Sequence, residues 1–384
     1  MFVSRYIAIP AIAFAAPLAA GNALAADQLT VKIGHVAAVS GPLSYFGKDN
    51  ENGARMAIDD LNARNITIGG KKARFVLLAE DDAGEPRLAT VVAQKLVDAR
   101  VNAVIGHETS GTSIPASKIY HDAGIPEISA ATTSPVYTEQ GFNTTFRVVV
   151  NDKQLGRTLG RYAVKDMKAR RVALIDDRTA YGQGIATEFV KGLREAGGTI
   201  VTKEFTNDKA TEFGAILTKV RATKPDLIFF GGMSAVAGPM LHQMKALGMG
   251  DLRLMGGDGI CSDEIGTLAQ GAMADGQVVC AEAGGIEDSA KAGLETFNAA
   301  YKKRFGIEVQ IYAPYVYDSI MTIVDAMVKA GSSEPAKYLP VLAQIRHTGL
   351  TGQIAFDQRG DIRDGTLTLY TFKNGRRTRI AVTK

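Results

Sequence analysis

The sequence contains few residues that bind metal ions, and it lacks the common motifs of nucleotide binding and serine catalysis. Only two cysteines, Cys261 and Cys280, and five scattered histidines occur among its 384 residues, which is too few to favour a metal site. No phosphate loop is present, no G-x-G-x-x-G motif follows a strand-like run, and the G-x-S-x-G elbow of serine hydrolases is absent. We therefore expect no metal, no cofactor and no enzymatic activity.

Long apolar runs and clusters of basic residues are missing as well. The 44 basic and 40 acidic residues give a net charge of +4 and are interspersed, which argues against a nucleic-acid partner. A membrane helix needs about 20 consecutive apolar residues, and no uninterrupted apolar span in the sequence is that long. Residues 1–25 combine one charge, Arg5, with an apolar stretch and a small-x-small pattern ending at Ala25. We predict a signal peptide cleaved near Ala25 rather than a membrane anchor, because prolines and a glycine interrupt the stretch.

An exported compartment permits Cys261 and Cys280 to form a disulfide. Such a bond would close a modest loop and stabilise the fold by about 3 kcal/mol in the chain-entropy model. Two free buried thiols are the alternative.

What the sequence does contain is a repeated alternation of short apolar runs with amphipathic segments. The apolar, β-branched runs are typical of strands buried on both faces of a parallel sheet, and they cover residues 31–39, 75–79, 103–106, 146–150, 172–175, 227–230 and 278–281. Segments with helical spacing of apolar residues lie between and after them, at residues 53–62, 88–99, 185–195, 213–223, 294–304 and 319–330. The predicted class is α/β, built from repeated strand-helix units.

The chain is longer than a single hydrophobic core usually supports, and its pattern restarts after Asn151. Both features predict two similar lobes. Residues 282–364 can return to complete the first lobe, and no Pro- or Ser-rich tether separates the halves. Since ligands of open α/β sheets sit at the carboxyl ends of the strands, two facing lobes predict a site in the cleft between them.

Two loops can hold a ligand in such a cleft. Residues 106–113 form a strand end followed by small hydroxylic residues. Ile114-Pro115-Ala116 then indicates a helix start, where backbone N–H groups attract anions. Ser110 can donate there to a carboxylate, although a loop in which Thr112 or Ser113 merely caps the helix is also compatible with the sequence. In residues 128–135, Thr133 offers an amide and a hydroxyl, and the Ala131 carbonyl can accept from an ammonium group. An ordinary surface loop is the alternative.

An ordered series of short motifs runs through the chain. The series comprises Val39-Ser40-Gly41-Pro42, Asp81-Asp82, Val104-Ile105-Gly106-His107, Pro115-Ala116-Ser117, Thr133-Ser134-Pro135, Asp177 with Tyr181-Gly182, Gly231-Gly232 and Gly256-Gly257-Asp258-Gly259. No single motif is specific, but the order resembles that of the periplasmic leucine/isoleucine/valine-binding proteins of ABC transporters. The resemblance spans about residues 29–372. It implies two Rossmann-like lobes, each a mostly parallel sheet flanked by helices, that are joined by three hinge crossovers and close around the ligand.

The resemblance also implies roles for individual residues. Ser110 and Thr133 match first-lobe residues that hold the carboxylate and ammonium of an amino acid, assisted by the Ala131 carbonyl. Tyr181 matches a tyrosine of the second lobe that closes over the ligand, and Asp258 matches an acidic residue opposite the ammonium, a chemically apt charged acceptor. Without the resemblance, Tyr181 would be expected to pack a turn and Asp258 to cap a helix near Ser262.

Three positions depart from the family pattern and bear on the ligand's side chain. Met233 and Phe46 stand where tyrosines are usual, and Met233 has no hydroxyl to donate. Glu108 stands where an aliphatic pocket residue is usual, and burying its carboxylate against leucine is unfavourable unless it finds a partner. An aromatic group can line the far side of the pocket, although core packing explains it equally well; it consists of Tyr312, Tyr315 and Tyr317.

These expectations define a monomeric extracytoplasmic solute receptor that delivers an amino acid, first of all a branched-chain one, to an inner-membrane ABC permease. A sensor subunit with the same fold, or a receptor for an aromatic acid or an amide, is the alternative. The expected boundaries are residues 26–150 plus 282–365 for the first lobe and residues 151–281 plus 366–384 for the second.

Overall fold

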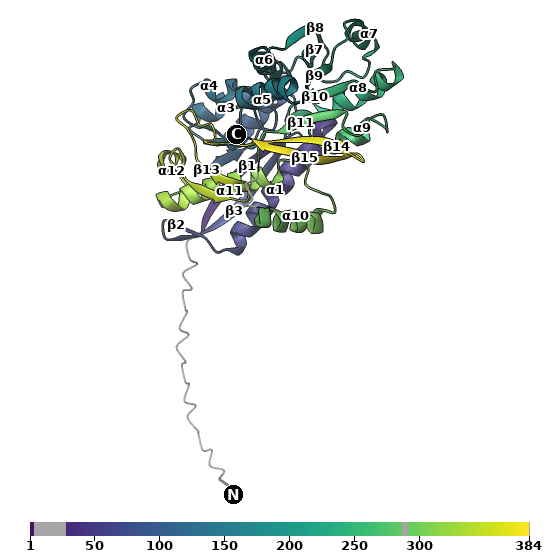
Figure 1. Cartoon of the computed structure of the whole chain (residues 1–384). Coiled ribbons are helices and arrows are strands. Elements are labelled where there is room, and N and C mark those ends of the chain that lie inside the picture. Colours follow the sequence, from purple (N-terminus) through teal and green to yellow (C-terminus); the bar gives the residue numbers. More distant parts are fainter. Residues whose placement is uncertain (4–27, 286–290, 384) are drawn as a thin grey trace.

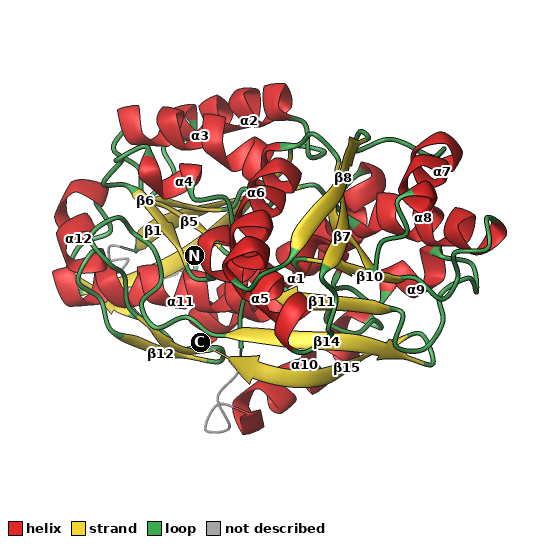
Figure 2. Cartoon of the chain, turned by 45° about the horizontal axis from the view of Figure 1, so that its top comes forward, coloured by secondary structure: helices red, strands yellow, loops and turns green. Residues whose placement is uncertain are grey.

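Two mostly parallel β-sheets, each covered by helices on both faces, make up the two halves of the molecule (Figures 1 and 2). The computed structural model describes residues 1–3, 28–285 and 291–383. Apart from its first three positions, the predicted signal peptide lies outside the described residues. Among the helices that are described, none is long and apolar enough to cross a membrane.

Lobe 1 is the six-stranded sheet and the helices that pack on it. Its strand order is β2-β3-β1-β4-β5-β6, and all neighbours are parallel except β2 and β3. The strands are β1 (Leu29–Ala37), β2 (Thr67–Ile68), β3 (Lys71–Asp81), β4 (Ala103–Ile105), β5 (Glu127–Ser129) and β6 (Thr145–Arg147). The helices are α1 (Ser44–Ala63), α2 (Pro86–Asp98), α3 (Ser110–Asp122), α4 (Val136–Glu139), α10 (Lys291–Phe305), α11 (Ala313–Ala330) and α12 (Pro335–Leu342). A small hairpin follows α12, formed by β12 (His347–Gly349) and β13 (Gly352–Ile354).

Lobe 2 is the seven-stranded sheet and its helices. Its order is β15-β14-β11-β10-β9-β7-β8, and only β14 and β15 run antiparallel to their neighbours. The strands are β7 (Arg171–Asp176), β8 (Thr199–Phe205), β9 (Leu227–Gly231), β10 (Arg253–Gly256), β11 (Val278–Glu282), β14 (Leu367–Lys373) and β15 (Arg376–Thr383). The helices are α5 (Asp152–Lys165), α6 (Ala180–Glu195), α7 (Gly214–Ala222), α8 (Ser234–Ala246) and α9 (Glu264–Leu268).

The central strands are buried on both faces, as the continuous apolar runs predict. In β9, Leu227 and Phe229 belong to the core beneath α5 and α6, whereas Ile228 and Phe230 belong to the core beneath α7 and α8. Successive side chains of a strand point to opposite faces, so a strand covered on both sides must be apolar throughout. Each predicted strand run overlaps an observed strand, and the predicted α/β class is confirmed.

The chain passes between the two sheets three times, near residues 148–150, 283–285 and 362–366. Hydrogen bonds tie these crossovers together: Val150 N–H donates to the Ala283 carbonyl (3.1 Å), and Thr366 Oγ1 donates to the Gly285 carbonyl (2.8 Å). Helix α11 packs against α1, β4 and β5, so the chain returns to lobe 1 between its second and third crossings. The predicted domain boundaries fall in these segments and stay a prediction.

The two cysteines form a disulfide that joins the turn after β10 to strand β11. Cys261 and Cys280 are completely buried, with their Cα atoms 5.4 Å apart. The predicted disulfide is present, and the alternative of two free thiols does not apply.

Candidate functional site

A narrow cavity lies where the carboxyl ends of strands from both sheets meet the starts of five helices, α1, α3, α6, α8 and α11. It is nearly closed, since only about 10 Å³ inside it is open to a water molecule. Its lining consists of Phe46, Glu108, Thr109, Ser110, Ala131, Tyr181, Met233, Asp258, Gly259 and Tyr312. The cavity therefore brings together the candidate ligand residues named from the sequence, except Thr133 and two members of the aromatic group, Tyr315 and Tyr317.

Ser110 is the first residue of α3 and lines the cavity from lobe 1. The N-cap of the helix is Thr109, whose side chain accepts the N–H of Thr112. The alternative in which Thr112 or Ser113 caps the helix is therefore wrong, because both residues lie inside it. The helix also starts four residues before the expected Ile114. Ser110 Oγ accepts the N–H of Ser134 at 3.2 Å, which ties α3 to the second predicted ligand loop.

Thr133 lies just behind the cavity wall and is completely buried. Its carbonyl accepts the N–H of Asp152 at 2.8 Å, and its hydroxyl interacts with the Asp152 carboxylate. Burial raises the pKa of Asp152 well above its usual range, and repulsion from Asp258 raises it further. Sequence reasoning missed Asp152, because an acidic residue after Asn151 is typical of an ordinary helix start.

Asp258 faces this loop region from lobe 2, and its carboxylate is held by two tyrosine hydroxyls. Tyr181 donates to Oδ1 at 2.9 Å, and Tyr312 donates to Oδ2 at 2.8 Å. The Tyr181 oxygen in turn accepts the N–H of Gly259 at 3.0 Å. Burial raises the pKa of Asp258, while the two hydroxyls lower it. The carboxylate caps no helix, and Tyr181 does more than pack a turn.

Glycines allow this arrangement because backbone and tyrosine approach closely. A Cβ at Gly257 would lie 2.6 Å from the Tyr181 hydroxyl, and one at Gly259 would lie 2.6 Å from the Gly232 carbonyl oxygen. Both contacts are shorter than side chains tolerate. The run Gly256–Gly259 is therefore needed for Tyr181 to reach Asp258.

The three residues that depart from the family pattern lie together in the cavity wall. The Phe46 ring packs against Tyr312, with centroids 5.4 Å apart. Met233 occupies the N-cap position of α8, where its side chain accepts no capping hydrogen bond. Glu108 is 6% exposed, and its Oε2 accepts the N–H of Ala38 at 3.1 Å. Burial raises the pKa of Glu108 well above its usual range, and repulsion from Asp82 adds to the shift.

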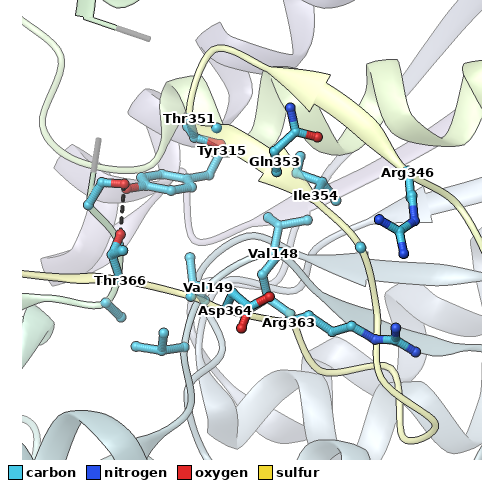
Figure 3. Close-up of a pocket in the computed structure, with 18 residues that line it drawn as sticks. Val148, Val149, Tyr315, Arg346, Thr351, Gln353, Ile354, Arg363, Asp364 and Thr366 are labelled. Carbon is cyan, nitrogen blue, oxygen red and sulfur yellow. Dashed lines mark hydrogen bonds between the residues drawn. The ribbon is translucent and has the colours of Figure 1, made fainter. Parts of the chain in front are cut away.

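Only one member of the predicted aromatic group reaches this cavity. Tyr312 lines it, whereas the Tyr315 hydroxyl donates to Glu282 (3.1 Å) and the Tyr317 hydroxyl to Asp60 (2.8 Å), outside the cavity lining. Tyr315 lines a separate pocket of about 310 Å³ between the three crossovers, shown in Figure 3. Core packing and hinge structure thus explain Tyr315 and Tyr317.

An outer cleft leads away from the cavity and shares Thr109, Tyr181 and Met233 with it. Residues of both lobes line this cleft, and an ion pair between Glu85 of lobe 1 and Lys209 of lobe 2 crosses it. Together with the contact between Tyr312 and Asp258, this pair joins the lobes on the side away from the hinge. The fold and site define a two-lobed binding protein whose site lies enclosed between the lobes.

Comparisons with known proteins agree with this class. A family model described as periplasmic binding protein matches residues 30–376. An amino acid binding protein of Pseudomonas aeruginosa is 35% identical over 88% of this chain and 89% of its own. The Leu/Ile/Val-binding protein homolog 1 of Brucella abortus is 33% identical over 95% of each chain.

Among solved structures, the branched-chain amino acid transporter substrate-binding protein LivJ of Streptococcus pneumoniae, in complex with isoleucine, superposes with a TM-score of 0.79. It is 29% identical and is matched over 92% of this chain and 99% of its own. The chain belongs to the Leu/Ile/Val-binding family of periplasmic binding proteins, as the ordered motifs predict. The relatives are solute-binding proteins.

Proposed function

We propose that this protein binds an α-amino acid between its two lobes and delivers it to the membrane permease of an ABC transporter. The observation that carries the proposal is the placement of a buried carboxylate, Asp258, across a narrow cavity from the start of helix α3. A zwitterionic head group needs an acceptor for its ammonium and donors for its carboxylate. The Asp258 carboxylate of lobe 2 is such an acceptor, and the start of α3 in lobe 1 provides such donors on the other side of the cavity.

In the proposed mechanism, lobe 1 holds the ligand first, through Ser110, Thr133 and the Ala131 carbonyl. Closure then brings Tyr181 and Asp258 onto the ligand. A ligand shifts the equilibrium between open and closed forms only by the contacts that it gains on closing, so the ammonium and Asp258 contribute most of that shift.

The names of the relatives support amino acids as ligands and make leucine, isoleucine and valine the first to test. We infer that the protein acts in the periplasm as a monomeric receptor and not as an enzyme, since its relatives are solute-binding proteins of transporters.

Calorimetric titration of protein stripped of bound small molecules against the twenty common amino acids tests the proposal. We expect at least one to bind with an affinity in the micromolar range or tighter. The N-acetyl and methyl-ester derivatives of that amino acid serve as controls, because each removes one charge of the head group. Binding of both derivatives with unchanged affinity, or no binding of any amino acid, would show that the site does not recognise a zwitterion.

A further inference from the structure

Glu108 has a free hydrogen-bonding atom in the wall of the ligand cavity. Its side chain lies where β4 leads into α3, close to Phe46, and is 6% exposed. Oε2 accepts the N–H of Ala38, while Oε1 accepts no hydrogen bond from the part of the chain that the structure describes. Oε1 is not among the fully buried polar atoms, so water can reach it in the empty cavity, and an apolar ligand group that displaces this water would leave Oε1 unpaired, which is unfavourable. A group on the ligand can supply the missing partner when the lobes close.

The surroundings of Glu108 favour a donor in that place. Three carboxylates of lobe 1, those of Asp82, Asp49 and Asp81, repel negative charge at Glu108, and the Ala38 N–H is the group that favours it. None of the described residues that line the cavity is positively charged. A hydroxyl or amide on the ligand pairs with Oε1 in both forms, because it can donate to the ionised carboxylate or accept from a proton on Oε1. An ammonium group fits the ionised form alone, and an apolar group leaves Oε1 unsatisfied in both forms.

The position of Glu108 separates it from the head-group contacts. Ser110, Ala131, Tyr181 and Asp258, the proposed contacts of the amino-acid head, lie in the same lining. The hydroxyls of Thr109 and Tyr312 already bond to Thr112 and Asp258, so the side chains of Phe46, Glu108 and Met233 are the ones available to the ligand's side chain. Phe46 and Met233 provide apolar surface, so Glu108 is the polar group that distinguishes one side chain from another of the same shape.

We propose that Glu108 makes the site selective for amino acids whose side chain carries a hydrogen-bond donor over apolar side chains of equal size. The inference rests on the proposed function and sharpens it, because it names the class of amino acid that the site prefers. The donor can belong to a hydroxyl, an amide or an ammonium group.

Pairs of amino acids of matched shape test this selectivity by calorimetry: threonine with valine, asparagine with leucine, and 2,4-diaminobutyrate with norvaline. For at least one pair we expect the donor-bearing member to bind about tenfold or more tightly. In Glu108→Leu we expect the apolar member of that pair to gain and the donor-bearing member to lose affinity, which reverses the preference. The variant Glu108→Gln keeps the size of the side chain and a hydrogen-bond acceptor. If the preferred ligand is threonine or asparagine, we expect this variant to retain its binding. If the preferred ligand is 2,4-diaminobutyrate, whose side chain carries an ammonium group, we expect binding to be lost.

Glu85→Leu is the matched control, because it removes a carboxylate from the outer cleft without touching the cavity. We expect it to leave the ratio within each pair unchanged. Thermal unfolding of all variants establishes that they are folded. If valine, leucine and norvaline bind the native protein at least as tightly as their partners, or if Glu108→Leu leaves the ratios unchanged, the selectivity is refuted while the proposed function stands. Failure of every amino acid to bind would instead refute the proposed function.

Discussion

The hydroxyl of Tyr312 forms a hydrogen bond across the cleft that exists only when the lobes are closed. Tyr312 belongs to lobe 1 and donates to Asp258 of lobe 2 at 2.8 Å. Its backbone is fixed, because the buried Asp49 carboxylate accepts the N–H groups of four successive residues, 310–313. Tyr312 therefore cannot follow Asp258 when the lobes separate.

Tyr312→Phe removes this contact and keeps the ring that packs on Phe46. A hydrogen bond to a charged group contributes about 1.5 to 3 kcal/mol. Since the bond exists in the closed form alone, its loss shifts the equilibrium toward the open form by the same free energy, or about 10- to 150-fold. We expect the dissociation constant for the amino acid to rise by a factor in this range, mainly through faster dissociation.

Calorimetry gives the dissociation constant, stopped-flow fluorescence gives the dissociation rate, and small-angle X-ray scattering gives the radius of gyration of the ligand-free protein. The matched control is Tyr317→Phe, which removes a hydroxyl-to-carboxylate bond of the same length, 2.8 Å to Asp60, inside lobe 1. We expect the control to bind normally. If Tyr312→Phe binds within twofold of the native protein and dissociates at the same rate, the contact does not hold the lobes closed.

Three further predictions concern the charge at the site, the disulfide and a buried histidine. Asp258→Asn should weaken amino-acid binding by about 2 to 5 kcal/mol in calorimetry, because it removes the buried partner of the ammonium, and unchanged affinity would exclude Asp258 from the site. Replacing both Cys261 and Cys280 by alanine should lower the free energy of unfolding in urea by about 3 kcal/mol, since the bond spans 19 residues; a loss below about 1 kcal/mol would contradict the loop-closure account. Burial lowers the pKa of His35 from 6.5 to about 4, so between these pH values the unfolded chain binds a proton that the folded chain does not. The free energy of unfolding should therefore fall by up to about 3 kcal/mol as the pH drops through this window. The fall should be smaller in His35→Gln. The control His242→Gln, at an exposed position, should behave like the native protein.

Most of the central strands could be predicted because burial on both faces leaves a continuous apolar run in the sequence, although the short central strands β5 and β10 were missed. The run at residues 227–230 appears in the structure as β9 (Leu227–Gly231), with alternate side chains in two cores. The strands β14 and β15 were not predicted. In β15 most residues are exposed or half-buried and charged ones recur, so this edge strand carries no comparable pattern.

The start of helix α3 shows where local chemistry is ambiguous. Hydroxylic residues stand at positions 109, 110, 112 and 113, and any of them is an acceptable cap. The structure assigns the cap to Thr109, which leaves Ser110 in the cavity wall. The order of motifs along the chain, rather than this loop, indicated Ser110.

Contacts between residues far apart in the sequence were beyond prediction. The partnership of Asp258 with Tyr312 joins positions 54 residues apart and depends on how the lobes meet. The proximity of Thr133 and Asp152 likewise follows from the first crossover, at residues 148–150. A single sequence contains no periodicity that reports such contacts.

The excess of buried acid at the lobe interface explains why closure should depend on a ligand. Glu108, Asp152 and Asp258 are all buried in the closed form, and burial raises the pKa of each. Opening the lobes returns water to the cavity wall and relieves the desolvation of Glu108 and Asp258. If the lobes close without a ligand, these carboxyl groups must either take up protons or remain ionised and buried, which costs free energy. In the proposed complex, an ammonium group at Asp258 and a hydrogen-bond donor at Glu108 remove that cost. The same acids that make the empty closed form unfavourable thus give the ligand the differential affinity that drives closure.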